Sequence, residues 1–242
     1  VRGHPIQKSR SLANQKRPCF AVVFYSRMKS FIPWKRKVCG FMSREETCQA
    51  LMRAGTVKFG EFTYASGAKG PIYIDLRKLV SFPEELKIVC SHLAKLVQGL
   101  ENTTVVLGAA TAGIPFSTLV SAETNIPMCY IRKKAKGHGT QSQIEGVFEK
   151  GQKAVLIDDL ITSGASKKIF VQGAREAGME IEDLVVILDR RADNDKGAID
   201  ELNVNLRSLL TLRELVDVVR KEGSASNEDL DRVEKWLAGE QW

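Results

Sequence analysis

The segment from Val155 to Ser166, with the sequence VLIDDLITSGAS, concentrates residue types that bind anions and hydroxyl groups. We expect an apolar strand to end at the adjacent Asp158 and Asp159, and a turn of small hydroxyl residues and glycine to lead into a helix. Backbone N–H groups at a helix start bind phosphate, and carboxylates accept hydrogen bonds from sugar hydroxyls or from the water around Mg²⁺. One aspartate would suffice as a helix cap, so the pair favours a sugar-phosphate site.

Two common nucleotide-binding motifs are missing from this segment. It contains neither the G-x-x-x-x-G-K-[ST] pattern of P-loop proteins nor the G-x-G-x-x-G pattern of dinucleotide-binding folds. The sequence therefore does not indicate an ATPase of the P-loop type or a nicotinamide-dependent enzyme.

A second chemical cluster follows the apolar run 128–132. Residues 130–140 contain four cations and one histidine among glycines, which predicts a mobile basic loop. Such a loop can stabilise negative charge that develops on an anionic leaving group and can exclude water when it closes. A solvated basic loop without a catalytic role is the alternative.

Three further segments could contribute to the same site. Small residues in 108–115 would let backbone amides approach an anion. Arg190 follows the apolar run 184–188, and its guanidinium could fork onto a carboxylate, although the neighbouring Arg191 offers the same chemistry. The segment 59–77 is either an ordinary hairpin or a turn and strand whose aromatic residues face a flat ring.

The arrangement of apolar runs predicts an α/β fold. Strands are expected at 104–107, 128–132, 154–158 and 184–188, and helices near 113–123 and 164–177. Alternating strands and helices indicate a parallel sheet, and such sheets bind ligands at the carboxyl ends of their strands. The chemical segments above follow these strands, so we expect them to meet.

Capping patterns place four more helices. Ser43 with Glu46 forms a capping box that predicts a helix to about Ala54. Pro83 is a favourable first-turn residue for a helix with an apolar stripe. Thr211 with Glu214 predicts another helix start, and Ser226 or Asn227 predicts the last.

Charge is distributed unevenly along the 242 residues. Residues 1–41 contain ten lysines and arginines and no acidic residue, whereas the whole chain has 36 basic and 29 acidic residues. The remainder therefore has 26 basic residues against 29 acidic ones, a net charge of −3, and is not expected to bind nucleic acid. We interpret 1–41 as a basic extension, disordered or non-native, and 42–242 as the functional domain. A transit peptide and a nucleic-acid or membrane-binding arm are the alternatives for the extension.

Cysteine content and hydropathy bear on the compartment. The five cysteines match no zinc or redox spacing, which favours free thiols and a cytoplasmic protein. The sequence contains no run of 18 apolar residues, so we expect no membrane span and no membrane partner.

The segment VLIDDLITSGAS resembles the signature of phosphoribosyltransferases that use phosphoribosyl pyrophosphate. The run from Arg132 to Gly139 resembles the R-K-x-x-K-x-H-G loop of the orotate phosphoribosyltransferases, and residues 59–77 and 108–115 resemble two other segments of that family. The resemblance implies the type I phosphoribosyltransferase fold, a parallel sheet flanked by helices with a small N-terminal hood. It also implies formation of orotidine 5-phosphate from orotate, with Mg²⁺, in pyrimidine synthesis.

The resemblance assigns roles residue by residue. It implies a homodimer in which Arg132, Lys136 and His138 reach into the partner's site. Orotate would contact Thr162 and Arg190, and no side chain is expected to ligate the metal directly. The catalytic residues would be Lys136, Asp158 and Asp159. The residues implied to bind phosphoribosyl pyrophosphate are Arg132, Lys133, Lys136, His138, Asp158, Asp159, Leu160, Ile161, Thr162, Ser163, Gly164, Ala165 and Ser166.

Two alternatives remain open at the level of sequence. One is a phosphoribosyltransferase acting on a purine or on uracil. The other is a regulator that binds phosphoribosyl pyrophosphate without catalysis and uses the basic segment 1–41 to bind nucleic acid, although that segment shows no helix-turn-helix pattern.

Overall fold

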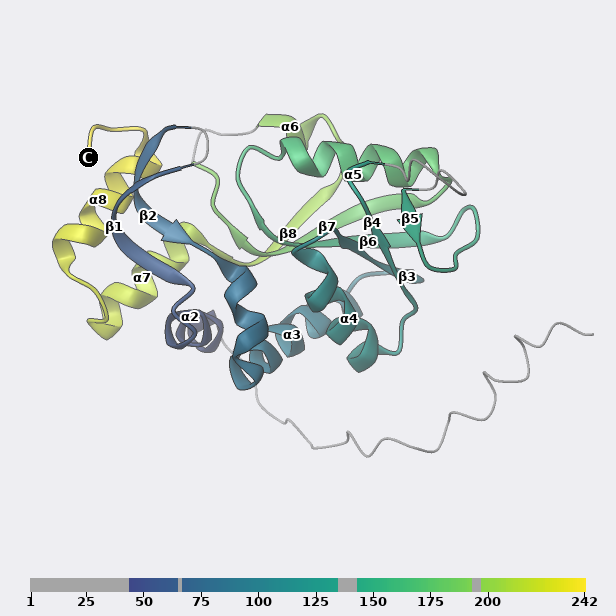
Figure 1. Cartoon of the computed structure of the whole chain (residues 1–242), viewed down its shortest axis with the longest axis horizontal. Coiled ribbons are helices and arrows are strands. Elements are labelled where there is room, and N and C mark those ends of the chain that lie inside the picture. Colours follow the sequence, from purple (N-terminus) through teal and green to yellow (C-terminus); the bar gives the residue numbers. More distant parts are fainter. Residues whose placement is uncertain (1–43, 65–66, 135–142, 193–196) are drawn as a thin grey trace, which may run out of the picture. The chain divides into compact units, whose positions relative to one another are not determined.

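A six-stranded sheet forms the centre of the domain (Figure 1). The computed structural model describes residues 44–64, 67–134, 143–192 and 197–242, all within the compact unit from Met42 to Trp242. The strand order is β5-β4-β3-β6-β7-β8. The strands span β3 Val105–Ala109, β4 Met128–Ile131, β5 Ile144–Glu145, β6 Lys153–Ile161, β7 Glu180–Asp189 and β8 Asn205–Thr211.

Five of these strands run parallel, and the four of them that the sequence predicts form the expected parallel sheet. The exception is the two-residue edge strand β5, which pairs antiparallel with β4. An antiparallel neighbour needs no helical crossover, and no helix stands between these two strands among the described residues. The sheet is therefore mixed at one edge only.

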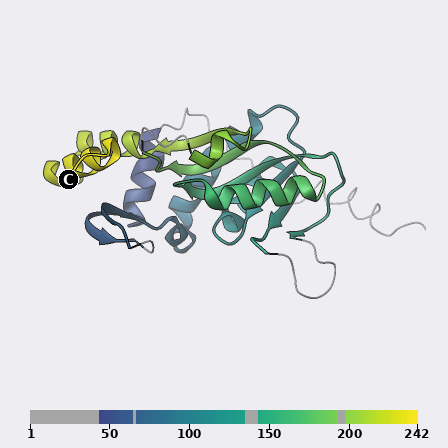
Figure 2. The ribbon, with the colours of Figure 1, turned by 90° about the horizontal axis from the view of Figure 1, so that it is seen from above.

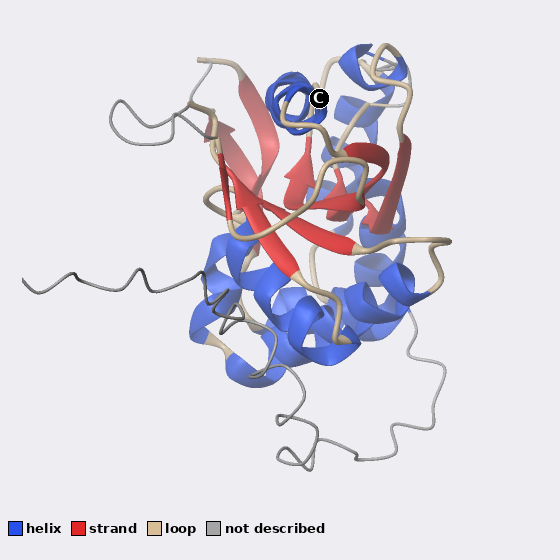
Figure 3. Cartoon of the chain, turned by 90° about the vertical axis from the view of Figure 1, so that its right-hand side faces the viewer, coloured by secondary structure: helices blue, strands red, loops and turns tan. Residues whose placement is uncertain are grey.

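Helices cover both faces of the sheet, as Figures 2 and 3 show. Helix α5 (Ala165–Glu176) lies on one face, and α3 (Pro83–Gln98) and α4 (Gly113–Thr124) lie on the other. The central strand β6 contributes side chains to the cores on both faces of the sheet, because successive side chains of a strand point to opposite faces. Val155 and Ile157 belong to the core on the α3 and α4 side, and Leu156 belongs to the core on the α5 side.

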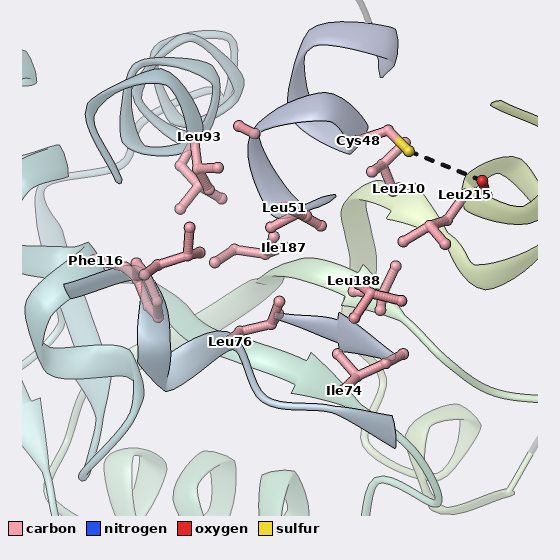
Figure 4. Close-up of a cluster of buried hydrophobic side chains, with 14 of the residues drawn as sticks. Cys48, Leu51, Ile74, Leu76, Leu93, Phe116, Ile187, Leu188, Leu210 and Leu215 are labelled. Carbon is pink, nitrogen blue, oxygen red and sulfur yellow. Dashed lines mark hydrogen bonds between the residues drawn. The ribbon is translucent and has the colours of Figure 1, made fainter. Parts of the chain in front are cut away.

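The larger core joins the sheet to the terminal helices (Figure 4). Helix α2 (Arg44–Arg53) contributes Cys48 and Leu51, and α7 (Leu212–Glu222) contributes Leu215. The Cys48 thiol donates to the Leu215 carbonyl across 3.8 Å, and burial raises its pKa to about 12. This helix pair thus packs through buried apolar contacts.

A two-stranded hairpin lies next to the last helix and forms the expected hood. Strands β1 (Val57–Thr63) and β2 (Lys69–Ile74) pair antiparallel, and α8 (Asn227–Ala238) contacts both of them (Figure 1). The short helices η1 (Leu76–Ser81) and α6 (Gly197–Asp200) complete the described elements.

Helix ends agree with the capping patterns where these can be observed. Thr211 and Glu214 form the predicted capping box at the start of α7, and the Ser226 hydroxyl accepts from Asp229 N at the start of α8. Ser43 lies outside the described residues, so its capping box stays a prediction.

Several strand predictions were incomplete: β5 was not predicted, and β7 begins at Glu180 rather than at Leu184. We expected β6 to end at Asp158, but it continues to Ile161 because Leu160 and Ile161 pair with Leu188 and Asp189 of β7. Strand β8 was not predicted, because it lies at the edge of the sheet, pairs only with β7 and contains too many polar residues to give a continuous apolar run. The expected helices near 113–123 and 164–177 are present as α4 and α5.

The structure also shows the state of the cysteines and the hydropathy of the helices. The three cysteines in the described residues, Cys48, Cys90 and Cys129, are buried free thiols, as predicted. Among the helices described, none combines the length and the apolar character needed to cross a bilayer.

Candidate active site

A cavity of about 570 Å³ opens at the carboxyl ends of β3 and β6. This is the edge of a parallel sheet at which ligands are expected to bind. It brings together segments that are far apart in the sequence. The lining residues are Ile74, Asp75, Arg77, Ala110, Thr111, Ala112, Lys133, Asp158, Asp159, Leu160, Thr162, Ser163, Gly164, Ala165, Ser166, Lys167 and Phe170.

The loop 162–166 joins β6 to α5 and presents a helix start to the cavity. Gly164 has φ of +77°, a left-handed conformation that favours glycine. A Cβ atom there would also lie 2.9 Å from Cγ1 of Ile199. Helix α5 begins at Ala165, so its first backbone N–H groups and three hydroxyl side chains of the loop border the cavity. This arrangement suits a phosphate group.

Asp158 and Asp159 lie within β6, three and two residues before its end. Asp158 is only 6% exposed, and its Oδ1 accepts from Asp159 N at 2.9 Å. Oδ1 of Asp159 accepts from Leu160 N at 2.7 Å. Burial, followed by repulsion from Asp158, raises the pKa of Asp159 from 3.8 to about 6. The two acids are therefore electrostatically distinct.

Lys167 is a lining residue that our sequence reasoning missed. Its side chain is buried, and Nζ lies 2.5 Å from Oδ2 of Asp158. The available signal was its position, because Lys167 occupies the apolar face of α5 with Phe170, Val171 and Ala174. A charge on a core-facing stripe indicates a buried partner.

The loop after β3 forms another wall, as its small residues predicted. Ala110, Thr111 and Ala112 line the cavity, and the peptide bond between Ala110 and Thr111 is cis. Gly113 begins α4 against β6, where a Cβ atom would lie 2.3 Å from the Ile157 carbonyl oxygen. Only glycine lets α4 start so close to the central strand.

The basic run contributes one residue to the described cavity. Lys133 lines it, whereas Arg132 pairs with Glu145 of β5 at 3.0 Å. Lys136 and His138 lie outside the described residues. Their predicted contacts with a leaving group and a partner subunit stay predictions.

Arg190 follows β7, and its guanidinium lies against two neighbouring aromatic rings. Its guanidinium carbon is 4.4 Å from the ring centre of Tyr64, beside the hood, and 5.2 Å from that of Trp236 on α8. Burial lowers the pKa of Arg190, and no described residue forms a hydrogen bond with its buried Nε. Arg190 does not line the cavity itself, but its backbone N donates to Ile161 O, directly before the phosphate loop.

Arg191 makes a different set of contacts. It forks onto Asp189 through Nε and Nη2 at distances between 2.8 and 3.2 Å. Its guanidinium is therefore already engaged with a carboxylate, which favours Arg190 as the arginine that receives a ligand.

The hood contributes Asp75 and Arg77 to the cavity. Arg77 Nε donates to Asp75 Oδ1 at 2.7 Å, and this hydrogen bond lowers the pKa of Asp75 and raises that of Arg77. The segment 59–77 is thus a hairpin whose end reaches the site, and neither residue was singled out from the sequence.

Comparison with known sequences shows close relatives of the whole domain. The model of the phosphoribosyl transferase domain matches residues 79–208. The orotate phosphoribosyltransferase of Bacillus mycoides is 36% identical over 206 residues, covering 82% of this chain and 98% of the relative. That of Listeria innocua is 39% identical over 176 residues, covering 72% and 84%.

Solved structures agree. Orotate phosphoribosyltransferase from Aeropyrum pernix is 30% identical with a TM-score of 0.62, covering 74% of this chain and 99% of that one. The UMP synthase of Leishmania donovani is 31% identical with a TM-score of 0.72, covering 81% of this chain and 42% of that longer one.

Proposed function

The chain belongs to the orotate phosphoribosyltransferase family, and from this premise we propose how its residues carry out the reaction. The enzyme transfers the phosphoribosyl group of phosphoribosyl pyrophosphate to orotate in pyrimidine biosynthesis, giving orotidine 5-phosphate and pyrophosphate. The observation that carries the residue assignment is the cavity at the end of β6, which places two carboxylates beside a helix-start phosphate loop.

The loop 162–166 binds the 5-phosphate. Backbone N–H groups at the start of α5 and the hydroxyls of Thr162, Ser163 and Ser166 surround one end of the cavity. Leu160 and Ile161 hold this loop in register with β7. Asp158 and Asp159 accept hydrogen bonds from the ribose hydroxyls next to it.

The basic residues act on the diphosphate. The bond between the anomeric carbon and the diphosphate oxygen breaks as the ring nitrogen of orotate attacks, and the ribose becomes cationic in the transition state. Lys133 reaches the diphosphate from its own subunit. Arg132, Lys136 and His138 reach it from the partner subunit of a homodimer, where they stabilise the leaving charge.

Orotate lies between the cavity and the hood. Its carboxylate pairs with the guanidinium of Arg190, whose buried Nε forms no hydrogen bond with a described residue, and Thr162 contacts the ring. We assign this role to Arg190 rather than to Arg191, because the guanidinium of Arg191 already pairs with Asp189.

The residues fit a Mg²⁺ ion that arrives with the substrate. Asp158 and Asp159 line the cavity and can accept hydrogen bonds from the waters of a hydrated ion, and Mg²⁺ commonly keeps its waters and binds substrate phosphates. When bound, the ion would neutralise diphosphate charge. We place the protein in the cytoplasm, where its buried free thiols would stay reduced.

Replacement of Lys136 by alanine tests the assignment of the leaving-group cations. We expect kcat to fall by about 10²-fold or more, while binding of ribose 5-phosphate changes less than threefold, because that group contacts the loop 162–166. The control is Lys134→Ala, because Lys134 is an exposed lysine of the same basic run to which we assign no contact with substrate. Unchanged turnover in Lys136→Ala would contradict the role of Lys136.

A further inference from the structure

Lys167 occupies a position on the buried face of α5, where an apolar residue would be expected. On α5 the buried residues are Lys167, Phe170, Val171, Gly173 and Ala174, a spacing that forms the face turned to the sheet. Lys167 is 5% exposed. Burial of an ammonium group costs several kcal/mol unless a partner compensates it, so this lysine is kept at the cavity wall by a specific interaction.

The partner is Asp158, nine residues earlier. The loop 162–164 reverses the chain, so the first turn of α5 returns over the end of β6 and brings Nζ to 2.5 Å from Oδ2. Asp159 N holds the other oxygen at 2.9 Å. Both oxygens of Asp158 are therefore fixed, and each keeps a second lone pair for a ligand hydroxyl.

The ion pair also sets the charge of the cavity. Two adjacent carboxylates, Asp158 and Asp159, face a space that must accept a ligand with a phosphate and a diphosphate group. Without a buried cation both carboxylates would repel that ligand at close range, where the surroundings screen charge poorly. Lys167 neutralises one of them without occupying the phosphate loop.

We propose that Lys167 is a positioning residue that holds Asp158 in the orientation needed to bind the ribose of phosphoribosyl pyrophosphate. This inference rests on the proposed function of the cavity. It makes a buried residue of α5, outside the loop 162–166, part of the substrate-binding apparatus.

Three single variants separate this role from simple packing. Lys167→Met keeps the length of the side chain and removes its charge, and Lys167→Arg keeps the charge. Lys168→Met is the matched control, because Lys168 is the next residue and its partly exposed side chain pairs with Glu201 at 3.0 Å. Each variant is assayed with phosphoribosyl pyrophosphate varied at saturating orotate, then with orotate varied, and its urea unfolding is recorded.

We expect Lys167→Met to raise KM for phosphoribosyl pyrophosphate roughly tenfold or more, because it leaves a buried carboxylate unpaired. KM for orotate should change less than about threefold, since orotate contacts other residues. Lys167→Arg should recover part of the loss, and Lys168→Met should match the wild type. Lower stability with an unchanged KM in Lys167→Met would overturn the proposal.

A double-mutant cycle keeps the test decisive if Lys167→Met is poorly folded. In the Asp158→Asn variant, Lys167 has no carboxylate to orient. The double variant Asp158→Asn/Lys167→Met lacks both charges. Replacement of Lys167 in the Asp158→Asn background should then change the dissociation constant for phosphoribosyl pyrophosphate less than about threefold. A full additional loss in that background would mean that Lys167 does not act through Asp158. Failure of the wild type to bind phosphoribosyl pyrophosphate would instead refute the proposed function.

Discussion

We predict that the ionised carboxyl of Asp159, which lines the candidate active site, lowers the stability of the folded protein. Its pKa lies near 6 in the folded protein against 3.8 ordinarily, chiefly because the carboxyl is buried and then because Asp158 repels its charge. A raised pKa means that the folded state holds the proton more tightly than the unfolded chain does. Stability therefore falls as the pH rises from about 4 to about 6, and the full penalty persists at neutral pH.

The size of this penalty follows from the shift. Each pKa unit corresponds to about 1.4 kcal/mol, and the shift of about two units is an upper bound because the cavity admits water. Replacement of Asp159 by asparagine removes the charge and keeps an Oδ1 acceptor for Leu160 N. We expect the free energy of unfolding to rise by about 1–3 kcal/mol at pH 7.5.

Urea unfolding at pH 7.5 and at pH 4 measures this effect. The gain of Asp159→Asn should be present at pH 7.5 and should shrink toward zero at pH 4. The control is Asp75→Asn, because a hydrogen bond from Arg77 lowers the pKa of Asp75. Asp75 contributes stability above its unfolded pKa, so its replacement should destabilise the protein at pH 7.5. The reasoning would be refuted if Asp159→Asn were no more stable than the wild type at pH 7.5, or if its gain in stability were the same at pH 4 and pH 7.5.

Three further predictions test other parts of the structure. Trp236→Leu removes one ring from Arg190 and should raise KM for orotate about 2- to 30-fold, the range expected for a cation–π contact. Leu230→Ala, which removes a buried core side chain from α8, should lower stability and leave that KM unchanged. Gly113→Ala should lower the free energy of unfolding in urea by about 1–3 kcal/mol, because the added Cβ would clash with the Ile157 carbonyl. The control Gly99→Ala should lower it by less than half as much, and equal losses would contradict this packing. Mixing inactive Lys136→Ala and Asp159→Asn dimers should restore roughly a quarter of wild-type activity if sites are shared across a twofold dimer, and no recovery after subunit exchange would argue against shared sites.

Local chemistry explains what could be predicted from the sequence. The helix starts at Thr211 and Ser226 were predictable because capping is a contact between near neighbours. The strands of the sheet interior were predictable because burial on both faces leaves continuous apolar runs. The phosphate loop at 162–166 needs no long-range information either, since the strand, the turn and the helix that build it are contiguous.

Long-range contacts explain what could not be predicted. Strand β8 has the sequence NLRSLLT, which is neither a continuous apolar run nor a regular alternation, so its pairing with β7 decides its conformation. The distinction between Arg190 and Arg191 depends on Tyr64 and Trp236, which lie more than 40 residues away on either side. Asp75 and Arg77 join the cavity only because the hairpin folds over it.

The central claim is tested most directly by product formation in parallel reactions. Purified protein with Mg²⁺ and phosphoribosyl pyrophosphate is offered orotate, hypoxanthine or uracil, and nucleotide and pyrophosphate are quantified together. We predict that orotidine 5-phosphate and pyrophosphate form in equal amounts with orotate, and that the other two bases give at least 10²-fold lower kcat/KM, because neither offers a carboxylate to Arg190. Turnover of hypoxanthine or uracil without turnover of orotate would contradict the account.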